Sequence, residues 1–212
     1  MPKMTFGVML IVFSLSGGAA IAAEPEDEAA LPDPLELGIA AYQRGDFASA
    51  LRHFQPLAAQ GNAPAQSNLG LMYEEGRGVA QNYREAVRLF RLAAIQGDSS
   101  AQSNLGVMYE RGQGIARDYS EAIKWYRLAA ERRNPEALFN LGVAYKEGRG
   151  LPQDRVRAHM WFNLAASLAG GDAATLAARN RDLLIKSLTR EQLFLTQDMA
   201  RRCEANGFKN CE

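Results

Sequence analysis

The sequence has few of the residues that enzymes most often use for acid–base or metal chemistry. Its 212 residues include only two histidines, His53 and His159, and two cysteines. Both histidines lie within helical patterns, and His159 occupies the register that Val87 and Ile123 hold in earlier segments. A histidine in such a place is typically a partly buried, hydrogen-bonded structural side chain. We therefore predict no catalytic residue, no metal site and no cofactor.

The chain also lacks an excess of charge of either sign, because 24 basic residues balance 24 acidic ones. A protein that binds nucleic acid needs a basic stripe to neutralise phosphates, and neither the composition nor the local charge pattern contains one. We therefore expect a protein or peptide partner and no nucleic acid.

Long hydrophobic runs are missing except near the N-terminus, where residues 6–15 are mostly apolar. This run is shorter than the roughly 20 residues that a membrane-spanning helix needs. Lys3 precedes the run and small residues ending at Ala22 follow it, which is the pattern of a secretory signal peptide over residues 1–22. A retained membrane anchor is the alternative, and no cysteine lies near the cleavage point to carry a lipid. The pattern predicts a periplasmic or secreted protein with no transmembrane segment after cleavage.

The two cysteines, Cys203 and Cys211, are separated by seven residues near the C-terminus. An even pair in an exported protein predicts a disulfide that holds the C-terminal tail. A metal site is the weaker alternative, because both histidines lie far away in the sequence.

What the sequence does contain is a segment of 12 residues in three copies. The copies occupy residues 68–79, 104–115 and 140–151, so they begin 36 residues apart (104 − 68 = 36 and 140 − 104 = 36). A fixed period of this length is the signature of a stacked repeat array.

Each copy covers the end of one helical pattern and the loop that leads to a second. A glycine ends the first helix, and Asn82 caps the second, with Glu85 three residues later completing a predicted capping box. Asp118 and Glu121 repeat this arrangement, whereas Arg157 replaces the acid in the third copy. The second helices alternate small and large residues at helical spacing, so that neighbouring helices can interlock. Each repeat therefore needs its neighbour to bury its apolar face.

These patterns predict an all-α protein, a right-handed α-solenoid of antiparallel helix pairs with a C-terminal capping helix pair. The predicted units are a flexible acidic leader at 23–34, a divergent helix pair at 35–64, repeats at 65–100, 101–136 and 137–172, and a helical cap at 173–212. Matching Tyr42 with Tyr73 gives the divergent pair a loop five residues shorter than that of the repeats.

The repeated residues resemble the Sel1-like repeat, a relative of the tetratricopeptide repeat with a longer loop between its helices. The residues that carry the resemblance are Ala65, Leu69, Gly70, Tyr73, Gly76, Gly78, Val79, Asn82, Ala86, Ala93 and Ala94, with matching positions 36 and 72 residues later. The resemblance covers residues 65–172 strongly and 35–64 loosely, and it indicates an exported bacterial member. It implies a scaffold or adaptor role, commonly in envelope signalling.

The resemblance also raises an enzymatic alternative, because a cysteine-rich branch of the family is linked to β-lactam binding. The cysteine pair in every repeat of that branch is absent here. No serine is followed three residues later by lysine, as the penicillin-recognising nucleophile motif requires. A β-lactam-binding or cell-wall-acting enzyme is therefore the weaker reading, and a secreted effector scaffold is a further alternative.

The best candidates for a binding site are three rows of residues on the first helices. In the tetratricopeptide folds that the sequence resembles, these helices line a concave groove that holds extended peptides. The rows are Asn68, Asn104 and Asn140; Leu71, Val107 and Val143; and Glu74, Glu110 and Lys146. An asparagine amide both donates and accepts hydrogen bonds, which suits a peptide backbone. The alternative is that the asparagines bond one another or neighbouring loops as a stacking ladder.

Overall fold

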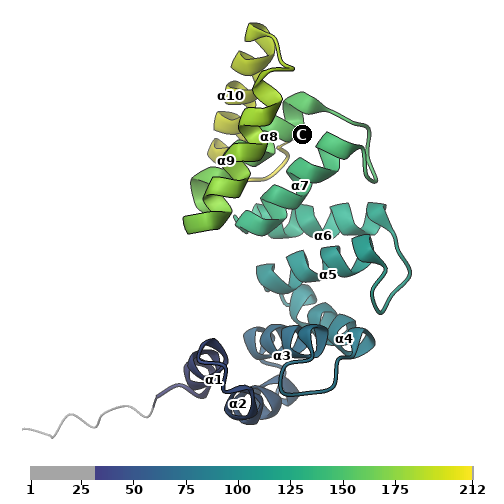
Figure 1. Cartoon of the computed structure of the whole chain (residues 1–212), viewed down its shortest axis with the longest axis vertical. Coiled ribbons are helices and arrows are strands. Elements are labelled where there is room, and N and C mark those ends of the chain that lie inside the picture. The colour runs from purple at the N-terminus through teal and green to yellow at the C-terminus, as the bar shows by residue number, and fades with distance from the viewer. Residues whose placement is uncertain (1–31, 212) are drawn as a thin grey trace, which may run out of the picture. The chain divides into compact units, whose positions relative to one another are not determined.

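Ten helices follow one another through residues 32–211, the part of the chain that the computed structural model describes (Figure 1). They are α1 Pro34–Gln43, α2 Phe47–Ala59, α3 Ala63–Glu75, α4 Tyr83–Ile95, α5 Ser99–Arg111, α6 Tyr119–Glu131, α7 Pro135–Glu147, α8 Arg155–Leu168, α9 Gly171–Ile185 and α10 Arg190–Ala205. No strand lies within this range, so the all-α prediction is confirmed. The predicted signal peptide and residues 23–31 of the predicted leader lie outside the described residues.

The helices pack in pairs, and the pairs stack in the order of the chain. α1 packs on α2, α3 on α4, α5 on α6 and α7 on α8, while α2, α4 and α6 each contact the first helix of the next pair (Figure 1). Buried side chains form clusters within and between successive pairs. This arrangement confirms the predicted α-solenoid.

Side chains cap α4, α6 and α8 as predicted, but the reciprocal half of the capping boxes predicted at Asn82 and Asp118 is absent. The Asn82 side chain accepts hydrogen bonds from the backbone N–H groups of Arg84 and Glu85 at the start of α4. The Glu85 carboxylate binds Arg88 instead, with 2.6 Å between Nη2 and Oε1. Glu121 likewise pairs with the lysine three residues later. The backbone N–H groups of Asn82 and Asp118, which the glutamate of a capping box would bind, donate instead to the carbonyl oxygens of Tyr73 and Tyr109.

Within each repeat, a glycine of the first helix lies against an aromatic ring of the second. A Cβ atom at Gly70 would lie 2.8 Å from Cε1 of Phe90, and Gly106 and Gly142 meet the rings of Tyr126 and Phe162 in the same way. Such contacts are too close for any side chain larger than hydrogen. Glycine at this position therefore sets how closely the two helices approach.

The first helix pair, α1 and α2, is built on the same contact. A Cβ atom at Gly38 would lie 2.5 Å from Cε1 of Phe54, so Gly38 is the structural equivalent of Gly70. This equivalence matches Ala41, rather than Tyr42, with Tyr73. The loop spans residues 44–46 here and 76–82 in the next pair, which is three residues against seven. The predicted difference of five residues is therefore wrong by one, and the loop is four residues shorter.

The loops also join successive repeats. Gly114 lies between α5 and α6 with φ of +70°, and a Cβ atom there would collide with the backbone carbonyl of Tyr83 in the preceding repeat. Gly150 approaches the backbone of Tyr119 in the same way, at 2.7 Å from its carbonyl oxygen. The second glycine of each loop thus serves both the turn and the contact between repeats.

The C-terminal helices α9 and α10 both pack against α8. The tail after α10 turns back toward the stack, where the Phe208 side chain is buried beneath the Arg133 guanidinium, 5.2 Å from the ring centre. None of the helices within residues 32–211 is long and apolar enough to cross a membrane.

Candidate functional site

The first helices α3, α5 and α7 carry the nine predicted groove residues, and three of these line one cavity. The cavity has a volume of about 520 Å³ and lies against α3, α5 and the first turn of α7. Its lining residues are Pro64, Ser67, Asn68, Leu71, Asp98, Ser100, Asn104 and Glu136. Asn68, Leu71 and Asn104 are the predicted members, and we call this space the polar cavity.

The three asparagines are engaged differently from one another. The Asn68 amide donates a hydrogen bond of 2.8 Å to the carbonyl oxygen of Pro64, one turn back in its own helix. Asn140 has a buried amide nitrogen with no hydrogen-bond partner in the described residues. Asn104 is half-buried, and its side chain forms no hydrogen bond within residues 32–211. No hydrogen bond joins these asparagines in this range, so the structure contains no stacking ladder there.

Two of the three residues in the aliphatic row pack against the hydrophobic core. Val107 and Val143 are half-buried against the core cluster to which helices α6 to α10 contribute. Leu71 is also half-buried, but its side chain lines the polar cavity. Leu71 is therefore the member of this row that the structure brings together with the asparagines.

Two members of the charged row make contacts between repeats. Glu110 accepts a hydrogen bond of 2.8 Å from the Tyr126 hydroxyl and forms an ion pair of 2.7 Å with Arg149 of the next repeat. Lys146 donates a hydrogen bond of 3.3 Å to Asn180 of α9. These side chains hold successive helix pairs together, and their predicted role in ligand binding stays a prediction.

The remaining member, Glu74, belongs to a small electrostatic group with Arg111 and Glu136. Burial raises the pKa of Glu74 above its ordinary value, against the opposing effect of the Arg111 charge, and the Glu75 and Glu136 charges raise it further. The Glu74 carboxylate forms no hydrogen bond or ion pair in the described part of the chain. It is a partly desolvated acid that a cation could neutralise.

Glu136 is one of the five lining residues that the sequence prediction missed. It belongs to the first turn of α7, where the other two repeats have Pro64 and Ser100, so it does not recur with the 36-residue period. Although part of the side chain is exposed, nearby protein atoms desolvate its carboxylate and raise its pKa, while Arg111 and Ser103 lower it. The signal that could have identified it is an acidic residue at a register that is uncharged in the other repeats.

A buried hydroxyl adjoins this carboxylate. Ser103 of α5 is fully buried, and its Oγ atom has no well-formed hydrogen bond among the described residues. Its neighbours on α5, Ser100 and Asn104, both line the polar cavity. An unsatisfied buried hydroxyl is costly, and the Glu136 carboxylate is the polar group close enough to reduce this cost.

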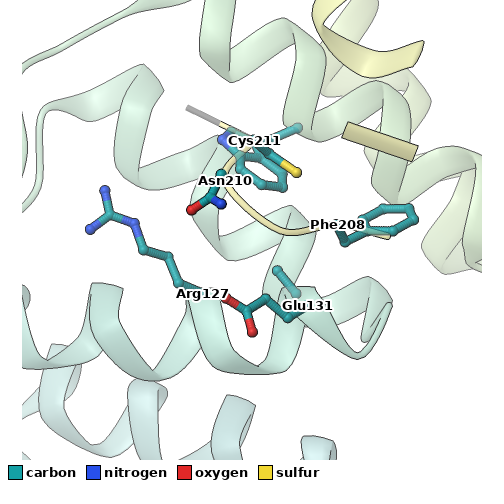
Figure 2. Close-up of a pocket in the computed structure, with 7 residues that line it drawn as sticks. Arg127, Glu131, Phe208, Asn210 and Cys211 are labelled. Carbon is teal, nitrogen blue, oxygen red and sulfur yellow. The ribbon is translucent and has the colours of Figure 1, made fainter. Parts of the chain in front are cut away.

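The predicted disulfide between Cys203 and Cys211 is present, with 4.7 Å between the Cα atoms. It ties the tail to α10 beside a cavity of about 290 Å³. Figure 2 shows Arg127 and Glu131 of α6 facing the tail that carries Phe208, Asn210 and Cys211. The disulfide thus fixes the chain segment that closes one side of this cavity.

His159 is buried as predicted, but one part of the expectation is wrong. Its Nδ1 atom has no hydrogen-bond partner within the described residues. Burial and the Arg181 charge lower the pKa of His159, and the Asp182 charge opposes them. No group of three or more histidine, cysteine, aspartate or glutamate residues in the described range is placed to hold a metal ion.

Stacked helix pairs of this kind define an α-solenoid repeat protein. The model of the Sel1 repeat matches the chain four times in succession, at residues 35–62, 63–98, 99–134 and 135–169. The chain belongs to the Sel1 repeat family, whose members are typically protein-interaction scaffolds.

Two solved structures are similar to this chain. A Sel1 repeat protein from Oxalobacter formigenes is 36% identical with a TM-score of 0.62, over 68% of this chain and 57% of that one. A protective antigen present in uropathogenic Escherichia coli strains, which displays an SLR fold, is 41% identical with a TM-score of 0.60. That match covers 66% of this chain and 31% of the antigen, so this chain spans less than two thirds of either protein. No curated protein matches the sequence.

Proposed function

We propose that this protein is a non-enzymatic adaptor or regulator of the bacterial envelope that binds a protein or peptide on the face formed by α3, α5 and α7. The observation that carries the proposal is the polar cavity, which three successive repeats build together and which includes Asn68, Leu71 and Asn104. Membership of a family of interaction scaffolds supports a protein or peptide as the ligand. The disulfide supports an oxidising compartment, since such bonds persist mainly in exported proteins.

The chemistry of the cavity suits an extended backbone. The Asn104 amide has no partner within residues 32–211 and can donate to a carbonyl while accepting from an N–H group. Leu71 supplies an apolar contact beside it, and the acidic side chains of Glu74 and Glu136 favour a partner that carries positive charge.

The test is a selection of random 12-residue peptides displayed on phage against the full chain, expressed with its own leader. Selected peptides are then synthesised, and their affinities are measured for the wild type and for Asn104→Ala and Leu71→Ser. Leu128→Ser, on the exposed side of α6, is the matched control. We expect each cavity variant to weaken binding about tenfold, the order of one lost hydrogen bond or apolar contact, while the control binds as the wild type does.

Two results would overturn the proposal. One is a selection that returns no peptide with measurable affinity. The other is an Asn104→Ala variant that melts at a much lower temperature yet binds the selected peptides unchanged, which would make the asparagine structural. The non-enzymatic part is tested by incubation with a chromogenic β-lactam and with cell-wall fragments, where we expect no rate above buffer.

A further inference from the structure

A second cavity adjoins the polar cavity on the same side of the stack. It has a volume of about 400 Å³ and lies between the first turn of α7, the end of α8 and the start of α9. Its walls include Phe139, Ala165, Ala169, Ala173 and Leu176, and we call it the apolar cavity. Glu136 lines this cavity and the polar cavity alike, so the two cavities meet at this residue.

The apolar cavity has the dimensions and chemistry to take one bulky apolar side chain. Alanines of α8 and α9 leave the space open, because their side chains end at Cβ. Phe139 forms a fixed wall, since its ring packs on that of Phe162 with 5.3 Å between the ring centres. Leu176 is 50% exposed, although a leucine of a packed helix normally gains by burial.

The charges around the two cavities favour a cation on the occupant. No lysine or arginine lines either cavity in the described structure, whereas Glu136 lines both. The charge of Glu136 acts on Glu74 and raises its pKa, and Arg111 is the basic residue that acts on both carboxylates. Two acids with one cation leave a local excess of negative charge. A lysine or arginine of a partner would neutralise this excess and stabilise the ionised carboxylate of Glu136.

We propose that the polar and apolar cavities form one two-part site for an extended peptide. A lysine or arginine of the peptide pairs with Glu136, and a bulky aliphatic or aromatic side chain of the same peptide enters the apolar cavity beside Leu176. The peptide backbone between them crosses the first turn of α7. This assignment rests on the proposed function and adds to it the chemical class of the ligand.

The experiment uses synthetic 12-residue peptides with a fluorescent label on an alanine and serine background. Each carries one lysine and one phenylalanine, with one to four residues between them. Matched peptides replace the lysine by glutamine or the phenylalanine by alanine. Fluorescence anisotropy then gives the affinity of the full chain for each peptide. We expect at least one spacing to bind at least tenfold more tightly than either matched peptide.

Variants of the protein test which cavity each peptide side chain occupies. Glu136→Gln is expected to remove the preference for lysine over glutamine and to weaken the dependence on salt. Leu176→Gln is expected to remove the preference for phenylalanine over alanine. Glu36→Gln in the first turn of α1 and Leu183→Gln, whose side chain is 67% exposed on α9, are the matched controls and should leave both preferences unchanged.

The outcomes separate this proposal from the one on which it rests. If peptides from the phage selection bind in an Asn104-dependent way but show neither preference, the two-part site is wrong and the proposed function stands. If no peptide of either kind binds, both fail. If Leu176→Gln instead changes the sedimentation of the protein from a dimer to a monomer, a second copy of the chain covers the apolar cavity and the peptide assignment is overturned.

Discussion

Gly106 of α5 lies directly against the ring of Tyr126 of α6, so closely that a Cβ atom at position 106 would be 2.5 Å from Cε1 of the ring. The same relationship recurs in the repeats before and after it. It allows the hydroxyl of Tyr126 to reach Glu110, one turn along α5 from the glycine, where the hydrogen bond measures 2.8 Å. The glycine therefore positions both a core aromatic ring and a polar contact at the surface of the first helices.

Substitution of Gly106 by alanine tests this relationship. The added methyl group has no space unless the Tyr126 ring or a helix moves, and overpacking of this kind costs about 1–3 kcal/mol. We expect a loss of that size in the free energy of unfolding, measured with urea. Gly170→Ala is the matched control, because no atom lies within 4 Å of a Cβ there. A loss at Gly106 no larger than at Gly170 would show that the helices are not in fixed contact.

Removal of the disulfide by the double substitution Cys203→Ala and Cys211→Ala should destabilise the C-terminal end of the stack. The bond closes a loop of nine residues, and in the chain-entropy model such a loop contributes ~2.5 kcal/mol. We expect a loss near this value in chemical unfolding, together with faster hydrogen exchange in α10. The wild type treated with a reductant should behave like the double variant. Unchanged exchange in α10 would contradict a role for the bond in stabilising α10 against α8.

The dependence of stability on pH should report the desolvated carboxylate of Glu136. Its pKa in the folded protein is raised above the ordinary value of 4.5, so the folded state binds the proton more readily than the unfolded state. The ionised carboxylate therefore costs stability at pH 7, and this cost disappears as the pH falls below 4.5. We expect Glu136→Gln to be more stable than the wild type at pH 7 and equally stable at pH 3.5, as measured by thermal unfolding. A difference that does not change with pH would argue against desolvation.

His159 should produce a pH dependence of the opposite sign. Burial lowers its pKa in the folded protein below the ordinary value of 6.5, so the unfolded chain takes up the proton first. The stability that the neutral side chain provides is therefore present above pH 6.5 and is lost as the pH falls through the folded pKa. His159→Val copies the residue type found at Val87, and we expect it to flatten the fall in melting temperature between pH 7 and pH 5. His53→Gln is the matched control, and an equal flattening there would contradict the assignment to His159.

The fold was predictable because the residues that begin, end and pack the helices of each repeat lie close together in the sequence. The left-handed glycine at position 76, the cap at Asn82 and the alternation of small and large residues in the second helices depend on near neighbours in the sequence. The loop length of the first pair was misjudged because Tyr42 is the same residue type as Tyr73 but does not occupy the equivalent position in its helix, which is that of Ala41. Gly38, whose contact with Phe54 is visible only in three dimensions, gives the true equivalence.

The candidate site was predictable only in part. Asn68, Leu71 and Asn104 follow from the helical register, and they line one cavity. Glu136 breaks the period, so a search for recurring residues passes over it. The ion pair between Glu110 and Arg149, 39 residues later, could not be predicted from the repeat spacing. The position of a residue in the repeat does not determine which neighbouring repeat its long side chain contacts.

The packing of α9 and α10 on the same helix has a consequence for how this protein can be lengthened. In the repeats, every second helix is covered by its own partner and by the first helix of the next pair, so the array can grow there. α8 is covered by α7, α9 and α10 together, and α10 occupies surface that further growth would need. A copy of residues 99–134 inserted upstream of α7 would extend the array, whereas one inserted after α8 would displace its terminus. The array can therefore be lengthened between its repeats, whereas the surface after α8 is already covered.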